Sequence, residues 1–210
     1  MNIYDLLNEC RSNLNPYLLK VLSNINIDGE WLVLDMGCGT GISAIEIAKK
    51  FNCKIYAVDA DKKALENLRE NKKDYKIEIL NGDLSLAKKT HIKFDLVLAE
   101  GIFNIIGFDK GIEFTDEVLK RGGYLLLHDS IGDEEYKNEL LKEYGYRTLY
   151  SFPLNEEAWG KDYVSCLERN IDKYQEFKGD NVYKEIQSNI MMYKNEPKSF
   201  QSIYNLIQKL

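Results

Sequence analysis

One strand–turn–helix signal near the amino end constrains the fold of this chain more than any other feature. Residues 32–41 read LVLDMGCGTG, in which a short apolar run reaches Asp35 and three glycines follow at every second position. Residues 42–50 then repeat apolar side chains at helical spacing. Glycine has no Cβ and tolerates positive φ, so a turn of this kind lets the backbone approach a ligand closely. The pattern predicts a strand, a tight glycine turn and a helix in an α/β fold.

The residues around the glycines indicate which ligand the turn takes. A dinucleotide-binding fingerprint needs a small residue at its last position, and Ile42 stands there in the frame that starts at Gly37. Asp35 is also unexpected beside a pyrophosphate, because both groups are negative, whereas a carboxylate suits a cationic ligand with an amino group. These two positions disfavour an NAD(P)-dependent oxidoreductase.

The spacing of Asp35 and the three glycines resembles the first motif of class I S-adenosylmethionine (SAM) dependent methyltransferases. In that family the glycine turn passes beneath the methionine part of SAM. The resemblance covers residues 31–130 well and the rest of the chain loosely. It implies that SAM is the cofactor and S-adenosylhomocysteine (SAH) the product. The implied contacts in the turn are Asp35, Gly37, Cys38, Gly39 and Gly41.

A second strand, over residues 54–59, also closes on an acid. Asp59 falls 20 residues after Gly39. A carboxylate at that place accepts hydrogen bonds from both ribose hydroxyls, in NAD and in SAM alike. Asp59, with Ala60 beside it, therefore indicates an adenosine ligand without saying which one.

A third acid follows the next strand. Residues 76–80 alternate apolar and polar side chains, as a half-exposed edge strand does. The residues after it, Gly82, Asp83 and Leu84, resemble the family's "gD" element. The resemblance implies that the acid accepts from the adenine amino group and that the next backbone N–H meets a ring nitrogen. Acids at the ends of three successive strands are a more specific signal than any one of them.

Residues 94–99 form the most continuous apolar run, as expected for a central strand of a parallel sheet. Residues 100–111 then resemble a group of microbial methyltransferases that read roughly SEGaiyNIGFekGl at this place and whose substrates are poorly defined. Ile106 stands as an insertion in that pattern. The matching positions are Glu100, Asn104, Ile105, Gly107, Phe108 and Gly111.

Three further strands complete the sheet. Residues 124–128 form a fifth strand that matches the family's "LkpGGylll" element, residues 147–153 a sixth, and residues 200–207 the last. The resemblance implies a Rossmann-like, doubly wound α/β sheet of seven strands in the order 3-2-1-4-5-7-6, with the last strand antiparallel.

The chain length and the helical stripes predict one domain, residues 1–210, with two additions. An N-terminal helical cap covers residues 1–28. A helical insertion before the last strand covers residues 154–197 and is a candidate substrate lid.

Composition excludes several classes of protein. The formal charge is −6 without any basic block, which disfavours a nucleic-acid partner. No run approaches the ~20 apolar residues of a membrane span, and the acidic start is not a secretory signal, so we predict a cytoplasmic protein. The cysteines form no C-x-x-C pair, which predicts reduced thiols and no structural zinc. They are Cys10, Cys38, Cys53 and Cys166.

Methyl transfer from a sulfonium is an in-line displacement, in which orientation alone lowers the barrier by ~7–11 kcal/mol. A general base matters only for a protonated nucleophile, so no catalytic triad is expected. Ligands of open sheets lie outside the carboxyl ends of the strands, where Glu100 and His128 are the candidate catalytic residues. His128 either takes the acceptor's proton with a pKa near ~6.5 or is a hydrogen-bonded pocket residue. Glu100 either holds a cationic substrate or closes the SAM pocket.

Polar and aromatic side chains of the cap, the insertion and the strand ends are candidates for acceptor binding. Aromatic rings can hold an apolar body or a cation. We predict no metal site, because a metal-dependent O-methyltransferase would need Asn where Ser130 follows Asp129. An adenine-amino methyltransferase is also disfavoured, because residues 99–102 do not form its NPPY-like tetrad. The candidates are Tyr4, Tyr17, Asn104, Asp129, Trp159 and Tyr163.

The sequence therefore predicts a SAM-dependent methyltransferase that acts on a small molecule. A protein or RNA methyltransferase is the alternative among enzymes. A non-catalytic adenosine-nucleotide-binding module that keeps the three acids is the alternative from another class. The acceptor atom stays open, and so does the choice between a monomer and a homodimer.

Overall fold

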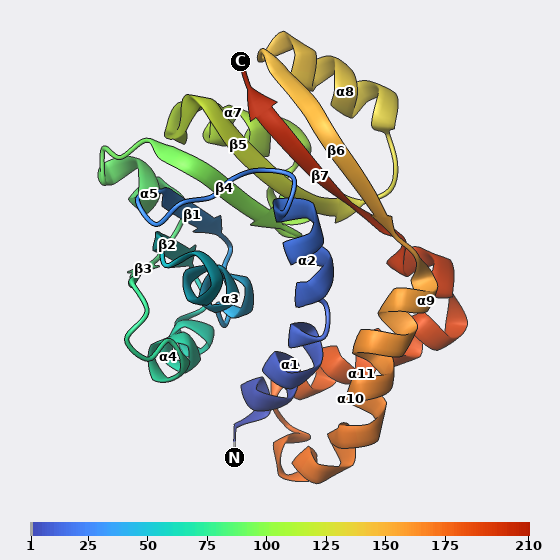
Figure 1. Ribbon diagram of the computed structural model, residues 1–210. Coiled ribbons are helices and arrows are strands. Elements are labelled where there is room, and N and C mark those ends of the chain that lie inside the picture. The colour runs from blue at the N-terminus through green and yellow to red at the C-terminus, as the bar shows by residue number, and fades with distance from the viewer. Residues whose placement is uncertain (1) are drawn as a thin grey trace.

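Seven strands form one mixed sheet through the centre of the computed structural model, which describes residues 2–210 (Figure 1). The order is β3-β2-β1-β4-β5-β7-β6, parallel from β3 to β5, with β7 antiparallel to both of its neighbours. The predicted order and the antiparallel last strand are confirmed. The strands are β1 Leu32–Met36, β2 Lys54–Asp59, β3 Ile77–Asn81, β4 Phe94–Glu100, β5 Leu119–Ser130, β6 Tyr146–Leu154 and β7 Ser202–Lys209.

Helices cover both faces of the sheet, as the doubly wound fold requires. One face carries the first four helices and the insertion, and the other carries α5 to α8. The helices of the plain fold are α1 Ile3–Ser12, α2 Asn15–Leu22, α3 Ile42–Phe51, α4 Lys62–Asn71, α5 Ser85–Lys89, α6 Ile102–Ile106, α7 Phe108–Val118 and α8 Glu134–Glu143.

Each central strand contributes to two separate cores. In β4, Leu96 and Leu98 pack under the helices of the first face, whereas Val97 and Ala99 pack under those of the other. Successive side chains of a strand point to opposite faces, so a strand covered on both sides buries every residue. This explains why residues 96–99 read as a continuous apolar run.

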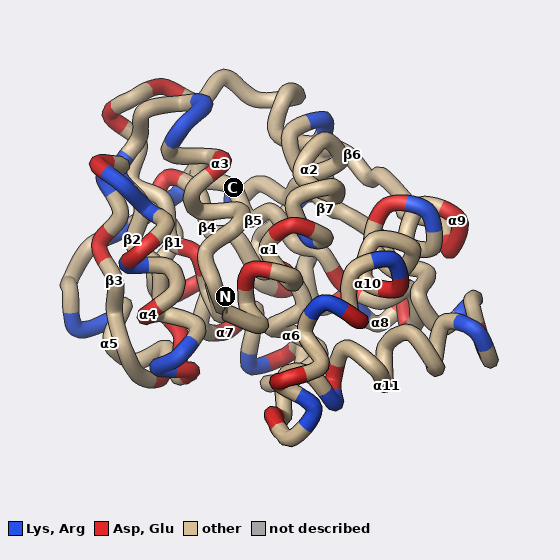
Figure 2. Tube along the Cα trace, turned by 90° about the horizontal axis from the view of Figure 1, so that it is seen from below, with Lys and Arg blue, Asp and Glu red and all other residues tan. Residues whose placement is uncertain are grey.

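The N-terminal segment forms two helices that pack on the same face of the sheet as α3 and α4. Asn2 caps α1 in a capping box with Asp5, and Pro16 occupies the first turn of α2. α1 lies between α3 and the insertion (Figure 2). Met1, the first residue of the predicted cap, lies outside the described residues.

The insertion between β6 and β7 is helical, with two departures from the predicted bounds. Leu154 still belongs to β6, and a 3₁₀ turn extends the insertion so that β7 begins at Ser202 rather than at residue 200. Its pieces are α9 Glu156–Ala158, the π-helix η1 Trp159–Val164, α10 Ser165–Asn170, η2 Ile171–Phe177, α11 Asn181–Asn195 and η3 Pro197–Phe200.

A disulfide ties the cap to the insertion. Cys10 of α1 is bonded to Cys166 of α10, 156 residues further along the chain, while Cys38 and Cys53 are free. The expectation of reduced thiols is therefore wrong for this pair. Cysteine spacing cannot give such a pairing, because it depends on how two distant segments pack.

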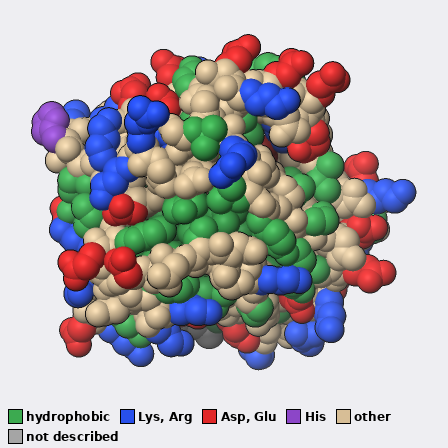
Figure 3. Space-filling view, turned by 45° about the horizontal axis from the view of Figure 1, so that its top comes forward, with side chains coloured by type: hydrophobic (Ala, Val, Ile, Leu, Met, Phe, Trp, Pro, Cys, Tyr) green, Lys and Arg blue, Asp and Glu red, His purple; other side chains and the backbone are tan. Residues whose placement is uncertain are grey.

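The surface mixes charges of both signs. In Figure 3, Lys and Arg side chains stand among Asp and Glu side chains around a band of apolar side chains. Between residues 2 and 210, no helix is both long and apolar enough to cross a membrane.

Candidate active site

The glycine turn between β1 and α3 presents an open backbone surface. Gly37, Gly39 and Gly41 have φ values of 68°, 53° and 74°, which glycine adopts without strain. A Cβ on Gly41 would come within 2.3 Å of Leu68, so this glycine allows α3 to pack closely on α4. A Cβ on Gly39 would meet nothing within 4 Å. The turn therefore fits a ligand that lies directly on the backbone at Gly39.

Asp59 at the end of β2 is held in place by the same turn. Its Oδ2 accepts a hydrogen bond from the Gly39 N–H at 2.7 Å, and its Oδ1 accepts one from the Asp61 N–H at 2.8 Å. The side chain is only half-buried, and each oxygen has a second lone pair, so it can still bind ribose hydroxyls. Ala60 beside it is exposed. The Gly82 N–H donates to the Asp59 carbonyl at 2.9 Å, which aligns the end of β3 with this site.

Asp83 lies on the surface at the end of β3. Its carboxylate accepts hydrogen bonds from the hydroxyl and from the backbone N–H of Ser85, the latter at 2.8 Å, and these bonds lower its pKa. Leu84 is half-buried and packs against the core under α5 to α8. The contact of Asp83 with an adenine amino group stays a prediction.

Asp35 and Glu100 bring two acids together at the ends of β1 and β4. Burial raises the pKa of Asp35 well above its usual value, and the charges of Glu100 and Asp59 raise it further. Burial also raises the pKa of Glu100, against hydrogen bonds from Ser43 and from Tyr204 and against the positive charge of Arg11. Across residues 2–210, neither carboxylate has a lysine or arginine nitrogen within 4.0 Å. A cation between them would relieve this repulsion, so the site fits the ammonium and sulfonium groups of SAM.

His128 at the end of β5 is a neutral hydrogen-bonding residue. Its Nε2 lies 2.8 Å from Ser202 Oγ, which also accepts from Trp159 Nε1 at 2.9 Å, and its Nδ1 lies 4.0 Å from Glu100 Oε2. Burial, followed by the positive charge of Arg11, lowers its pKa to about 3. The expectation that His128 titrates near ~6.5 is therefore wrong, because desolvation disfavours the charged ring.

An aromatic cluster surrounds His128. The imidazole stacks on Tyr204 with 3.8 Å between ring centroids and lies parallel to Trp159 at 5.8 Å. Trp159 meets Tyr163 edge to face at 5.6 Å. The structure thus brings two predicted acceptor residues, Trp159 and Tyr163, together with Glu100 and His128.

Three other predicted acceptor residues bond within the protein. Tyr4 donates to Asp61 at 3.0 Å, so it docks α1 on the cap of α4. Tyr17 donates to Asp162 at 2.6 Å, which docks α2 on the insertion, and its ring stacks on a phenylalanine of β6. Asn104 is exposed and accepts from the Ser130 hydroxyl at 3.0 Å. These bonds explain the positions of the three side chains without a ligand.

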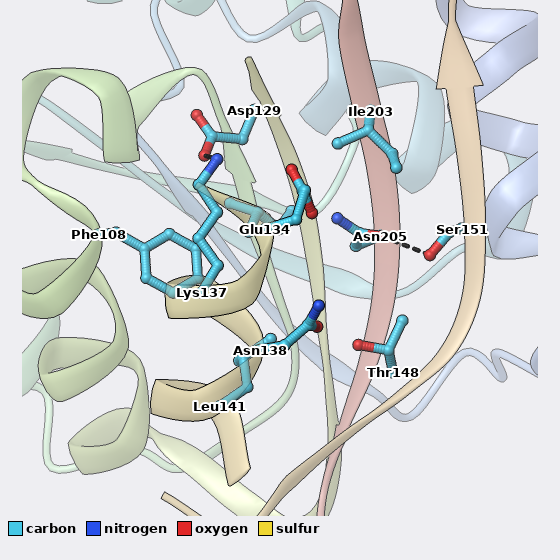
Figure 4. Close-up of a pocket in the computed structure, with 11 residues that line it drawn as sticks. Phe108, Asp129, Glu134, Lys137, Asn138, Leu141, Thr148, Ser151, Ile203 and Asn205 are labelled. Carbon is cyan, nitrogen blue, oxygen red and sulfur yellow. Dashed lines mark hydrogen bonds and ion pairs between the residues drawn. The ribbon is translucent and has the colours of Figure 1, made fainter. Parts of the chain in front are cut away.

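Asp129 points to the other face of the sheet from its neighbour His128, because successive side chains of a strand alternate. Its carboxylate pairs with Lys137 of α8 at 2.8 Å and lines a cavity of about 90 Å³ (Figure 4). The structure therefore does not bring Asp129 together with Glu100, and β5 continues through Asp129 to Ser130 instead of ending at residue 128.

Sequence reasoning missed four residues around Glu100 and His128: Arg11, Ser43, Ser202 and Tyr204. The Tyr204 hydroxyl donates to Glu100 Oε2 at 2.9 Å. Ser202 and Tyr204 occupy alternate positions of β7, directly opposite Ser130 and His128. Strand alternation combined with the predicted antiparallel last strand was the signal that could have found this pair.

Comparison with known proteins decides the family. Residues 33–123 match a family described as "Methyltransferase domain". A probable cobalt-precorrin-6B C(15)-methyltransferase (decarboxylating) of Methanococcus maripaludis strain C6 is 37% identical over 146 residues, covering 69% of this chain and 71% of that protein. The chain belongs to the class I SAM-dependent methyltransferases. SAM is the cofactor of that family, as the motifs predicted.

Other relatives of this methyltransferase carry different substrate names. A ribosomal protein L11 methyltransferase of Thermosipho melanesiensis is 34% identical over 110 residues, which is 52% of this chain and 42% of that protein. The chain spans only 42% to 64% of the length of this and three further curated relatives. A SAM-dependent methyltransferase from Geobacter sulfurreducens, solved with SAH, has the same fold, with a TM-score of 0.69 at 15% identity over 93% of this chain and 90% of that one.

Proposed function

We propose that this protein transfers a methyl group from SAM to a small-molecule acceptor. The observation that carries the proposal is the pair of buried acids, Asp35 and Glu100, beside the open backbone at Gly39, with no lysine or arginine nitrogen of residues 2–210 within 4.0 Å of either carboxylate. Such a site attracts a cation, and Asp59 can accept hydrogen bonds from ribose hydroxyls. An NAD-type ligand, with its anionic pyrophosphate, would be repelled by the same acids.

Bound SAM supplies an electrophilic methyl group on a positive sulfur. The residues of this chain orient the two reactants and exclude water. Glu100 and Asp35 balance the positive charge, and Asp59 holds the ribose. Trp159, backed by the buried rings of His128 and Tyr204, walls the acceptor side. Because His128 is neutral with a pKa of about 3, we expect an acceptor whose nucleophilic atom already has a free lone pair at neutral pH.

The enclosure of the acceptor side supports a small molecule rather than a protein or an RNA. The disulfide between Cys10 and Cys166, together with the bond from Tyr17 to Asp162, fixes the cap against the insertion. Tyr163 is buried between them. We propose that α1 and the insertion cover the acceptor. A chain segment or an RNA loop would have to displace this covalently tied lid.

The test is a methyl-transfer screen with labelled SAM. One arm uses a panel of metabolites, and the others use ribosomal protein L11 and total RNA. We expect label in the metabolite arm alone. Label only in the protein or RNA arm would move the proposal to the alternative that the L11 methyltransferase relatives suggest. Binding of SAM without turnover in any arm would favour the non-catalytic module.

A further inference from the structure

The sheet-facing stripe of α8 is polar where the stripe of a covering helix is normally apolar. Residues that face a sheet from a helix recur at positions i, i+3, i+4 and i+7, and apolar side chains usually occupy them. In α8 these positions hold Glu134, Lys137, Asn138 and Leu141, and all four line the cavity under the helix. Leu141 is buried, whereas Glu134 and Asn138 are exposed. The first two turns of α8 therefore place polar groups against the sheet.

The strands opposite this stripe also contribute polar side chains to the cavity. Leu127 of β5 lies opposite Asn205 of β7, and Asn205 lies opposite Ser151 of β6. Cross-strand partners share a face of the sheet, and Asp129 shares the face of Leu127 because side chains alternate along a strand. The Ser151 hydroxyl donates to Asn205 Oδ1 at 2.6 Å. The result is a cavity of about 90 Å³ with hydrogen-bonding groups on its walls (Figure 4).

Asp129 brings a buried and half-paired carboxylate to the wall of this cavity. The residue is only 5% exposed. Its Oδ2 accepts from Lys137 Nζ at 2.8 Å, and the same ammonium donates to the Ser130 carbonyl at 3.0 Å. Its Oδ1 is buried and has no hydrogen-bond partner among residues 2–210. Buried polar atoms of folded proteins are rarely left unpaired, so this oxygen fits a donor that comes from a ligand.

The lining favours a small cation with N–H donors. The described residues that line the cavity include two acids, Asp129 and Glu134, and one base, Lys137, so their net charge is −1. Such a lining attracts cations and repels anions. A volume of about 90 Å³ exceeds the ~30 Å³ that one water occupies in the liquid, so there is room for a few non-hydrogen atoms. Leu127 and Leu141 add apolar wall beside the charges.

We propose that this cavity binds small primary amines in their ammonium form. The ammonium donates to Asp129 Oδ1 and directs its other N–H groups at the polar walls, while a short alkyl stem contacts the leucines. The cavity belongs to the face covered by α5 to α8, whereas Trp159 and Tyr163 pack on the other face. A ligand here is therefore not the methyl acceptor, and the proposal does not depend on the proposed function.

The test is a two-dimensional ¹H–¹⁵N NMR titration of the full protein without SAM, at matched chloride concentration. The probe is ethylammonium, beside ethanol, which is uncharged, and tetramethylammonium, which has no N–H donor. Ethylammonium should bind with a dissociation constant in the millimolar range, as its few atoms allow. It should shift the backbone amide signals of Asn138, Ser151 and Asn205. The other two probes should bind at least about tenfold more weakly, because a charge-assisted hydrogen bond needs both the charge and the donor.

Variants of the two acids separate ligand binding from folding. Glu134→Gln changes an exposed residue, so it should keep the thermal midpoint and weaken ethylammonium several-fold. Glu135→Gln, at the next and equally exposed position but outside the cavity, is the matched control and should bind like the parent. Asp129→Asn should weaken ethylammonium at least about tenfold, because the charged acceptor is lost. If Asp129→Asn fails to fold, the comparison of Glu134→Gln with Glu135→Gln still decides.

Three results would overturn the proposal. The first is equal binding of ethylammonium and ethanol, or the absence of any saturable shift, which would leave the cavity to water. The second is a set of shifts that falls outside the residues around the cavity. The third is an unchanged affinity for ethylammonium in Glu134→Gln. Binding of SAM is measured separately, so failure of the proposed function and failure of this site are distinguishable.

Discussion

The two halves of the site are built in different ways. The cofactor half uses strand ends and the turns that directly follow them, so Gly39 and Asp59 meet through neighbouring strands and a backbone N–H. The acceptor half is assembled from segments far apart in the chain. Glu100 meets Tyr204 across 104 positions, and Tyr17 meets Asp162 across 145. The cofactor half therefore depends on local backbone geometry, whereas the acceptor half depends on how the cap, the insertion and the last strand pack.

The largest expected effect concerns the tie between cap and insertion. Replacing both Cys10 and Cys166 by serine should lower the free energy of unfolding by about 2–5 kcal/mol, since the disulfide closes a very long loop. SAH affinity should change little, because the glycine turn does not depend on this tie. Chemical denaturation and calorimetry measure the two quantities. Replacing the free Cys53 by serine is not a matched control, because it would put a hydroxyl into the core without breaking a disulfide. The parent protein with its disulfide reduced serves as the comparison instead. A large loss of SAH affinity would mean that the two halves are not independent.

The next effect belongs to the cofactor half. Asp59→Ala should weaken the binding of SAH by about 1.5–3 kcal/mol for each hydrogen bond between the carboxylate and the ribose that is lost. The exposed Asp172→Asn on η2 is a control that should bind SAH like the parent. Isothermal calorimetry compares them. Unchanged SAH affinity in Asp59→Ala would remove the assignment of Asp59 to the ribose.

Glu100 lies where the two halves meet and tests the charge argument. Glu100→Gln keeps the shape of the side chain but removes a negative charge. It should therefore weaken the binding of SAM, whose sulfur is positive, more than the binding of SAH, whose sulfur is neutral. The ratio of the two affinities should change roughly tenfold, or about 1.4 kcal/mol. Calorimetry with both ligands gives this ratio directly. An unchanged ratio would show that Glu100 does not face the sulfonium.

The pH dependence of stability tests the buried histidine. The pKa of His128 is lowered to about 3 in the folded protein, so between about pH 6.5 and pH 3 the unfolded chain binds more protons. The contribution of His128 is therefore intact above pH 6.5 and is lost by about 1.4 kcal/mol for each unit that the pH falls through this window. Glu100, whose pKa is raised, and Arg11 both face the ring, so the useful quantity is the difference between the parent and His128→Gln.

The difference in the free energy of unfolding between the parent and His128→Gln should fall as the pH is lowered from 6 to 5 and should be constant above pH 7. Chemical denaturation at each pH measures it. The rate of methyl transfer in the parent should show no limb near pH 6.5. A flat difference at low pH together with such a limb would restore His128 as an ordinary titrating base.

The smallest effect concerns the acceptor wall. Trp159→Phe keeps a ring but loses the N–H that donates to Ser202, so KM for the acceptor should rise several-fold, within about 1 kcal/mol, with SAH affinity unchanged. Steady-state kinetics and calorimetry separate the two. A rise in the Kd of SAH instead would place Trp159 in the cofactor half.

The sequence was a good guide to one half and a poor guide to the other for physical reasons. Glycine spacing and strand-end acids are local signals, and they predicted the cofactor turn. The strand order followed from the family resemblance and from the alternating strand and helix signals. The disulfide between Cys10 and Cys166 and the contacts of Ser202 and Tyr204 depend on packing between distant segments, which no spacing encodes. The error at Asp129 was avoidable, because alternation along β5 directs it away from His128.

The most direct test of the central claim is calorimetry of the parent protein with SAM and with NADH. The paired acids Asp35 and Glu100 beside the open turn at Gly39 predict micromolar binding of SAM and no binding of NADH. Micromolar binding of NADH without binding of SAM would contradict the account.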